Sequence, residues 1–466
     1  MVELMFHGAA GEVTGSMHML HIDGAWVALD CGMFQGRRAD SIAKNRQWPV
    51  PPDQIVAVVL SHAHIDHCGR LPKLVADGFN GRIFCTSATR DLCSIMLQDS
   101  AHIQQEDAEF LNRRRARQNL PPIEPLYTQA DAVAAVKLMQ SMQYDRPFSV
   151  EGVCEASYRE AGHMLGSAGI LLQLPAKSGR GRSIYFTGDI GRQRTPILRD
   201  PAFAPKADIV LSESTYGARV NPPLPDAEKQ FLGIVKQTFE RGGKVIIPAF
   251  SVGRTQTITY FLQNLFEAGL VPRHSVYVDS PLAVAATEVF KMHPECYDAD
   301  AKSLQSKSGG IFGGQFVQYI RDVEDSMKLN TLKGPCIIIS ASGMCESGRI
   351  LHHLKNHAGD AKNTILIPGF QAINTLGRRL VDGVREVMIY GEPVFVRAEV
   401  LQLHGFSGHA DQAELLSFLT PLAKGDPEIY LVHGEPEQST GLRDNLMAAG
   451  MRKVTVAQRG QRVQVG

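Results

Sequence analysis

Several features are missing from this 466-residue chain, and each absence excludes a class of protein. The chain has no run of about 20 apolar residues, which excludes a helix that spans a membrane. Its N-terminal segment lacks a basic stretch followed by an apolar one, so we expect no secretion signal. It has no internal repeat and no low-complexity tail, and we expect a globular protein of two or three domains.

An excess of charge of one sign is also missing. Lys and Arg together number 48, as do Asp and Glu, so the formal net charge is zero. Binding of nucleic acid through a global positive field is therefore excluded, and any such affinity has to come from a local cleft. The eight cysteines include no Cys-x-x-Cys pair. Two of them, Cys31 and Cys68, lie beside the polar motifs described below, where free thiols favour a reducing cytoplasm.

The most informative motif is SHAHIDH, residues 61–67. It follows the apolar run 55–60, which predicts a buried strand, and residues 69–74 predict the start of a helix. The histidines therefore fall on the loop where a strand ends.

The side chains of this loop are those that bind metal ions. His62 and His64 alternate and can point toward one ion, whereas Asp66 and His67 can turn toward a second. Imidazole and carboxylate groups suit zinc well. A polar loop with chance histidines is the alternative, and the spacing of the four groups disfavours it.

Four further polar residues follow apolar runs or lie in turns. Asp30 precedes the motif, and His163, Asp189 and His433 follow it. Loops at the ends of strands carry functional groups on a rigid sheet. Taken singly, Asp30 or His163 would equally suit a turn or a satisfied polar group in the core. Together with the first motif, they predict a set of ligands for two metal ions.

This pattern resembles the metallo-β-lactamase superfamily. The resemblance implies that His62, His64 and His163 bind one zinc ion. It implies that Asp66, His67 and His433 bind a second ion, and that Asp189 bridges both. Asp30 would be the acid that orients the histidine loop. In such sites a hydroxide shared by two zinc ions is the nucleophile.

The spacing of the ligands points to one branch of this superfamily. Asp189 and His433 lie 244 positions apart (433 − 189), which leaves room for an inserted domain. The following stretches resemble the β-CASP nucleases, and among them the bacterial relatives of the cleavage and polyadenylation specificity factor nuclease: 212–217 (SESTYG), 248–254 (PAFSVGR), 279–283 (DSPLA), 340–345 (SASGMC) and 404–411 (HGFSGHAD).

The β-CASP resemblance implies two more catalytic residues, Glu213 and His409. A carboxylate that accepts a hydrogen bond from a histidine fixes its tautomer and raises its basicity. The charged histidine could then protonate the leaving oxygen of a cleaved phosphodiester. Without a metal site, Glu213 would equally suit a carboxylate at a helix start, and His409 a residue at a helix N-terminus.

Other residues are candidates for binding the RNA backbone: Ser342, Gly343, Arg349, Arg254 and Arg378. The first two lie in a turn between an expected strand, 336–339, and an expected helix, 347–355. Backbone N–H groups of such a turn can bind phosphate. For any one arginine, a solvated surface charge is an equal alternative. The run 113–117 (RRRAR) predicts a basic face of an exposed helix that could steer nucleic acid.

The predicted fold class is α/β, with a metallo-β-lactamase αββα sandwich and an inserted β-CASP domain built on a parallel sheet. The N-terminal part of the sandwich is predicted at 1–207, the β-CASP domain at 208–395 and the C-terminal part of the sandwich at 396–466. Strand-to-helix repeats in the insertion, such as 244–247 followed by 255 onward, favour the parallel sheet. A helical stretch is expected over 101–145.

The resulting hypothesis is a cytoplasmic ribonuclease that holds two zinc ions per chain and hydrolyses single-stranded RNA in a cleft between its domains. His433 completes the second zinc site and favours RNA over DNA. The sequence leaves open whether cutting is endonucleolytic or 5′-exonucleolytic, and whether the chain forms a homodimer. Two alternatives remain: a di-zinc hydrolase of small esters or thioesters, and an inactive RNA-binding scaffold.

Overall fold

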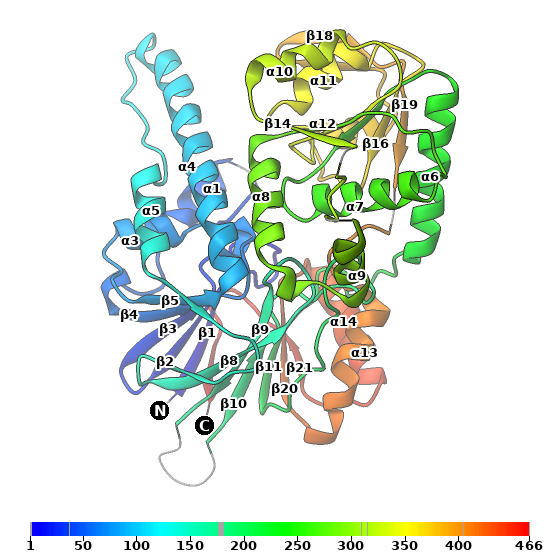
Figure 1. The fold of residues 1–466 in the computed structure, drawn as a ribbon. Coiled ribbons are helices and arrows are strands. Elements are labelled where there is room, and N and C mark those ends of the chain that lie inside the picture. The colour runs from blue at the N-terminus through cyan, green and yellow to red at the C-terminus, as the bar shows by residue number, and fades with distance from the viewer. Residues whose placement is uncertain are drawn as a thin grey trace. The chain divides into compact units, whose positions relative to one another are not determined.

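The computed structural model describes residues 2–36, 38–175, 181–308, 310–314, 316–403 and 405–465. The chain forms two compact units (Figure 1). Unit 1 contains residues 1–194, 200–220 and 409–466, and unit 2 contains 195–199 and 221–408. The domain borders expected at 207/208 and 395/396 stay a prediction, while the compact units change at 220/221 and 408/409.

Unit 1 contains two seven-stranded sheets, of which the first carries the N-terminal strands. The strands β3 to β6 run parallel to one another. In spatial order, the sheet consists of β22 (Arg462–Val465), β1 (Val2–Gly8), β2 (Met17–Ile22), β3 (Ala25–Leu29), β4 (Ile55–Val59), β5 (Arg82–Thr86) and β6 (Met139–Met142).

The second sheet of unit 1 joins segments that are far apart in the sequence. Its strands β10, β11, β20 and β21 are parallel neighbours, so their carboxyl ends meet at one edge. In spatial order, the sheet consists of β21 (Val454–Val456), β20 (Glu428–Val432), β11 (Ile209–Glu213), β10 (Ser183–Phe186), β9 (Ala168–Gln173), β8 (Cys154–Glu160) and β7 (Phe148–Val150).

The core of unit 1 lies between these sheets. Side chains such as Leu29 and Val59 from the first sheet join Ile170 and Leu211 from the second in one buried cluster. Helices α13 (Gln412–Leu419) and α14 (Pro436–Ala448) pack on the other side of the second sheet. Helix α4 (Ser87–Ala116) packs against β5 and β6 of the first sheet and against α5 (Gln129–Lys137). The predicted αββα sandwich is confirmed.

Two local predictions differ from the structure. A helix was expected from residue 69, but α2 (Ile65–Cys68) begins four residues earlier and is followed by α3 (Leu71–Ala76), so Asp66 and His67 lie in a helical turn. The stretch 101–145 was expected to be helical. It is interrupted after α4 by a segment without helix, and it ends in strand β6 after α5. Residues 120–122 (LPP) account for the interruption, because proline lacks the N–H that a helix interior requires.

Unit 2 is built on a six-stranded sheet in which every neighbouring pair is parallel. The predicted parallel sheet of the insertion is therefore confirmed. In spatial order, it consists of β14 (Val317–Ile320), β13 (Val276–Asp279), β15 (Ile337–Ser340), β12 (Val245–Pro248), β16 (Thr364–Ile367) and β19 (Glu399–Gln402).

Both faces of this sheet are covered by helices, and alternate side chains divide between two cores. In β12, Val245 and Ile247 pack with α6 (Leu224–Glu240) and α7 (Arg254–Glu267). Ile246 points to the other face and packs with α11 (Ile350–His357) and α12 (Leu376–Val381). Burial on both faces explains why these strands are continuous apolar runs. In the described part of the chain, no helix combines the length and apolarity that membrane crossing requires.

Candidate active site

The predicted metal ligands gather at the carboxyl ends of the strands in unit 1. Asp30 follows β3, and His62 and His64 lie between β4 and α2. Asp189 follows β10 and His433 follows β20. Because β3 and β4 are parallel, as are β10, β11 and β20, loops that are distant in sequence open at the same edges. These candidate residues therefore lie at strand ends, where the sequence argument expects them.

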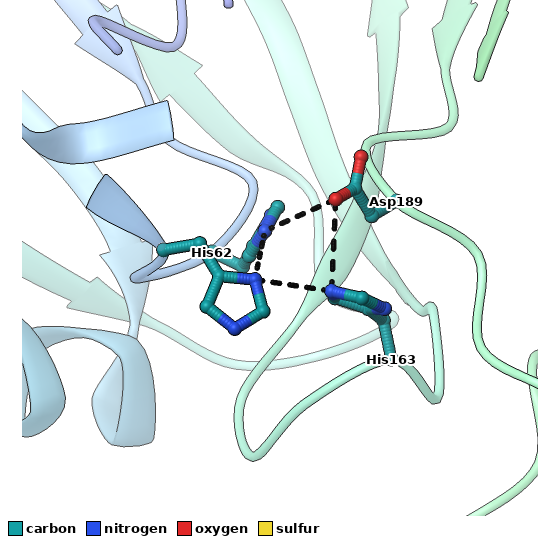
Figure 2. A group of neighbouring side chains, drawn as sticks. His62, His163 and Asp189 are labelled. Carbon is teal, nitrogen blue, oxygen red and sulfur yellow. Dashed lines mark hydrogen bonds and ion pairs between the residues drawn. The ribbon is translucent and has the colours of Figure 1, made fainter. Parts of the chain in front are cut away.

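The first group of side chains contains His62, His64, His163 and Asp189, with one ligand atom of each within 4.8 Å of the others. The Nδ1 atom of His64 lies 3.1 Å from Nε2 of His62 and 3.1 Å from Nε2 of His163. Asp189 Oδ2 lies 3.5 Å from Nε2 of His62 and 3.6 Å from Nε2 of His163. Figure 2 shows His62, His163 and Asp189 turned toward a common centre.

The second group contains Asp66, His67 and His433. The Nε2 atoms of His67 and His433 lie 3.1 Å apart, and His433 Nε2 lies 3.4 Å from Asp66 Oδ2. The other carboxylate oxygen of Asp189, Oδ1, faces this group at 3.4 Å from His67 Nε2. The two oxygens of Asp189 therefore face two different groups.

This donor set fits a metal ion. Pairs of imidazole nitrogens face each other, as in His67 and His433, and a ring nitrogen needs a proton or a cation between it and another acceptor. Asp189 Oδ1 is buried and accepts no hydrogen bond from the described residues. An orphaned buried carboxylate oxygen costs free energy unless a cation offsets it. Nitrogen and carboxylate oxygen are ligand atoms that zinc prefers.

Asp30 holds the histidine loop in place. It is fully buried, and its Oδ2 lies 2.7 Å from His67 Nδ1. Its Oδ1 accepts the backbone N–H of Ser61 at 2.8 Å, and the hydroxyls of Ser61 and Ser16 donate to Oδ2. The hydrogen bond at Nδ1 leaves Nε2 of His67 to face Asp189. Asp30 thus fixes the ring orientation and tautomer of a candidate ligand.

Burial and charge set the protonation of this cluster in the absence of an ion. Burial lowers the pKa of His62 well below its ordinary value and that of His64 to about 4. For His67, burial also lowers the pKa, but Asp189 and Asp30 outweigh it and raise the pKa well above the ordinary value. Neutral imidazole is the form that binds metal, so the burial of His62 and His64 favours ligation.

His409 lies beside the cluster and interacts with Glu213. Its Nδ1 lies 3.2 Å from Glu213 Oε2 and 3.8 Å from Asp189 Oδ2. Glu213 is fully buried at the end of β11, and its carboxylate also accepts the backbone N–H of Ile190. Burial lowers the pKa of His409, but Glu213 and Asp189 outweigh it and raise the pKa to about 9. Glu213 and Asp189 therefore favour the charged form of His409 beside the candidate ligand groups.

The candidate residues for the RNA backbone lie in unit 2. Ser342 and Gly343 follow β15, where the Ser342 hydroxyl accepts the backbone N–H of Glu346 at 3.1 Å. The guanidinium of Arg254 lies 5.9 Å from the ring centroid of Phe406. These two segments follow neighbouring parallel strands, β15 and β12, and so share one edge of the sheet.

The other two arginines are engaged by carboxylates. Arg349 donates to Asp279 Oδ1 at 2.7 Å and is largely buried, and α11 begins after it at Ile350 rather than at the expected residue 347. Arg378 pairs with Asp382 at 2.9 Å on the surface. Binding of RNA by these residues stays a prediction.

Sequence reasoning missed several partners of the site. Thr215 Oγ1 lies 3.0 Å from His433 Nδ1, and Ser16 and Ser61 surround Asp30. It also missed a buried network in unit 2, in which Asp279 Oδ2 accepts from His353 Nε2 at 2.7 Å. Asp279 lies at the end of an apolar strand, as several candidate ligands do. The same sequence signal, a polar residue after an apolar run, could therefore have marked it as buried and functional or structural.

Comparisons with known proteins agree with this geometry. Three family models match: the metallo-beta-lactamase superfamily over residues 10–92, the Beta-Casp domain over 255–380, and the Zn-dependent metallo-hydrolase RNA specificity domain over 393–457. Ribonuclease TTHA0252 of Thermus thermophilus is 36% identical over 458 residues, which cover 98% of this chain and 99% of that protein.

Two archaeal relatives are more distant. The RNase J-like protein of Methanocaldococcus jannaschii is 31% identical, with 94% of both chains covered. The transcription termination factor FttA of Methanosarcina mazei is 30% identical, with 94% of this chain and 68% of that protein covered. A solved structure, a protein of unknown function from Enterococcus faecalis V583, has a TM-score of 0.55 at 12% identity over 99% of both chains, and shows likeness of fold alone.

Proposed function

From the premise that the chain belongs to the β-CASP nucleases of the metallo-β-lactamase superfamily, we propose that it is a zinc-dependent ribonuclease that hydrolyses phosphodiester bonds in single-stranded RNA. The observation that carries this proposal is the position of Asp189 between two groups of histidines. A carboxylate in that position suits a bridge between two cations. The similarity to a ribonuclease along 98% of the chain supports RNA as the substrate.

Two zinc ions per chain are part of the proposal. His62, His64 and His163 would hold one ion, Asp66, His67 and His433 would hold the other, and Asp189 would contact both. When bound, zinc lowers the pKa of a water molecule toward neutrality and offsets the negative charge of a phosphate. Asp30 would keep Nε2 of His67 directed at its ion.

His409 and Glu213 provide the proton for the leaving group. With Nδ1 held by Glu213, Nε2 of His409 is the ring nitrogen that would transfer a proton to the departing 3′ oxygen. The bond from phosphorus to that oxygen breaks as a water oxygen bonds to phosphorus, which leaves a 5′-phosphate on the downstream product. The Glu213 carboxylate raises the pKa of His409 and favours its charged form, which can act as this acid. The assignment of Asp30, Asp189, Glu213 and His409 as catalytic residues remains part of the proposal.

The preference for RNA rests on His433 and on the ribose. A complete second ligand group includes His433, and a ribose 2′-OH can be read as both donor and acceptor. Ser342, Gly343, Arg254, Arg349 and Arg378 are proposed to contact the RNA backbone. All eight cysteines are free and buried, which supports a reducing compartment such as the cytoplasm.

The test compares RNA and DNA of one sequence, each single-stranded, at matched salt and zinc concentration. We expect much faster cleavage of RNA and a 5′-phosphate on its products. A circular RNA separates the two modes, because only an endonuclease can cut a strand without ends. Equal or faster cleavage of DNA would contradict the preference, and hydrolysis of small thioesters without any nuclease activity would support the alternative of an esterase. RNA binding without cleavage at full zinc occupancy would support an inactive scaffold.

A further inference from the structure

Helix α4 connects the candidate active site to an arm of unit 1 (Figure 1). At its start, the hydroxyls of Thr86 and Thr89 donate to the carbonyl of Gly166 at 2.7 and 2.9 Å. Gly166 belongs to the loop that carries His163. The helix then continues for 30 residues, to Ala116, and so reaches well beyond the sheet. One end of α4 is thus tied to the ligand loop, and the other end is remote from it.

The segment after α4 covers one face of this arm. Asn112 exchanges two hydrogen bonds with the backbone of Ile123, at 2.8 and 2.9 Å. Arg115 Nε donates to the carbonyl of Pro121 at 2.7 Å, and Tyr127 OH donates to Ser100 Oγ. These partners hold the returning chain along the side of α4 that carries residues 100, 112 and 115.

The opposite face of α4 is exposed and combines an aromatic ring with arginines. Phe110 has 65% of its surface exposed, and Arg113, Arg114 and Arg117 are also exposed. Positions three, four and seven residues after Phe110 lie on its side of the helix. Phe110 is therefore followed by three cationic side chains on a face that the returning chain does not cover, whereas Glu106 and Asp107 precede it on the same side of the helix.

From Phe110 onward, the charge of the helix end is of one sign. Residues 110–123 contain four arginines and neither Asp nor Glu. Among the described residues, Arg113, Arg114 and Arg117 form no ion pair. Arginines near a helix C-terminus interact favourably with the helix dipole, which explains their presence. The helix dipole does not explain why the large aromatic ring of Phe110 is exposed beside these arginines.

We propose that this face, formed by Phe110, Arg113, Arg114 and Arg117 and called here the arm face, is a second binding surface for single-stranded RNA. The arginines would contact phosphates, and a base would stack on Phe110, the combination that binds single strands without sequence preference. The occupant is a polyanion because the three arginines that follow Phe110 form no ion pair among the described residues, and residues 110–123 contain no carboxylate side chain. This inference rests on the proposed function, since it assigns part of the same substrate to the arm face.

The length of α4 predicts which RNAs can use the arm face. Phe110 lies 21 residues after Thr89, which places it about 32 Å along the helix axis at 1.5 Å per residue. A stacked strand rises about 3.4 Å per nucleotide, so roughly nine nucleotides are needed to reach from the His163 loop to Phe110. Shorter RNAs should be cleaved without any contribution from the arm face.

The experiment compares the triple variant Arg113→Ala/Arg114→Ala/Arg117→Ala with Phe110→Ala, using a 6-nucleotide and a 40-nucleotide RNA. For the longer RNA, we expect the slope of log K against log salt to become shallower by about 2 in the triple variant, at about 0.7 per phosphate contact. We expect Phe110→Ala to weaken binding of the longer RNA roughly 5- to 150-fold, the range for one stacked base. Phe110→Tyr should restore it. Cleavage of the 6-nucleotide RNA should stay within about twofold of wild type in every variant.

Matched controls separate these effects from general charge and folding. Arg90→Ala/Lys137→Ala/Arg443→Ala removes the same charge from other surfaces of unit 1, and Phe203→Ala removes a ring that is 94% exposed. Equal loss of long-RNA binding in the arm and control variants would overturn the proposal, as would a change of oligomeric state in Phe110→Ala without loss of RNA binding. Loss of short-RNA cleavage in the arm variants would also overturn it. If the wild-type protein neither binds nor cleaves RNA, the proposed function itself fails.

Discussion

Two buried aspartates, one in each unit, lie in similar positions but have different hydrogen-bond partners. Asp189 in unit 1 and Asp279 in unit 2 are both at most 2% exposed and lie at the carboxyl ends of strands. Asp279 Oδ1 accepts from Arg349 and its Oδ2 accepts from His353 and Ser326, so both oxygens have donors. Asp189 Oδ1 accepts no hydrogen bond from the described residues, although several histidines surround it.

The difference separates a structural carboxylate from a candidate ligand. A buried charge that is fully hydrogen-bonded needs nothing more from its surroundings, whereas a buried carboxylate oxygen that accepts no hydrogen bond is stabilised by a cation. Burial lowers the pKa of His62 and keeps it neutral, which suits ligation rather than ion pairing. The following predictions test this distinction, from the largest expected effect to the smallest.

Asp189→Ala should have the largest effect. Because one carboxylate faces both ligand groups, its loss should reduce zinc content from about two ions per chain and abolish RNA cleavage. Elemental analysis of metal-replete protein measures the first, and a labelled RNA measures the second. Asp279→Ala, the matched change in unit 2, should keep its zinc. Wild-type protein with one zinc ion or none would contradict the bridging role of Asp189.

His409→Ala should impair chemistry while sparing metal binding. Its Nδ1 faces Glu213, outside both histidine groups. We expect kcat to fall by roughly 10² to 10⁴, the usual range for a positioned general acid, with zinc content and RNA affinity near wild type. If zinc is lost along with activity, His409 is a ligand and not an acid.

Asp279→Ala should destabilise the protein without affecting metal content. Removal of one partner from a buried ion pair leaves Arg349 and His353 uncompensated and costs about 3–5 kcal/mol in the free energy of unfolding. Denaturant unfolding at saturating zinc measures this cost. The control Asp382→Ala removes the exposed partner of Arg378 and should cost less than about 1 kcal/mol. Equal costs for the two variants would show that the buried hydrogen bonds of Asp279 stabilise the fold no more than the exposed Arg378–Asp382 pair does.

Asp30→Asn should weaken zinc binding by roughly 10- to 100-fold, the usual effect of losing a group that orients a ligand. The amide cannot hold His67 Nδ1 and Ser61 in the same way as the carboxylate. Competition with a chelator measures the affinity. The hydroxyl of Ser16 contacts the same carboxylate at 3.1 Å, so Ser16→Ala should have a smaller effect. An effect of Ser16→Ala as large as that of Asp30→Asn would argue against orientation of His67 as the role of Asp30.

The smallest effect concerns pH. Burial alone would raise the pKa of Asp279, but hydrogen bonds from His353, Ser326 and Arg349 outweigh it and hold the pKa below its ordinary value. A carboxylate with a lowered folded pKa stabilises the fold above its unfolded pKa, about 3.9. That stability should be lost as pH falls below about 4, and unfolding of Asp279→Asn should depend less on pH there. The same slope in both proteins would contradict this assignment.

The contrast between the units also shows which residues of the site could be predicted from the sequence and which could not. The sequence predicts His62, His64, Asp66 and His67 as candidate ligands because four metal-binding groups occur within six residues after an apolar run. Asp279 follows an apolar run too, yet its partners lie 47, 70 and 74 positions away, and no local spacing reveals them. Arg349 was therefore assigned to RNA although its guanidinium is paired with Asp279. The helix start at Ile65 was missed because a loop was expected to carry all the histidines.

The pairing of β1 with β22 has a consequence for the order in which the protein is made. During synthesis, β1 cannot pair with β22 until residues 462–465 have been made. In the same way, β11 cannot pair with β20 until β20 has been made. Nearly all of unit 2, residues 221–408, forms one continuous segment and can fold while translation continues. Unit 1 cannot bring His433 to the other candidate ligands until β20 (Glu428–Val432) has been made. A growing chain that has not reached residue 433 therefore carries an incomplete set of candidate ligands.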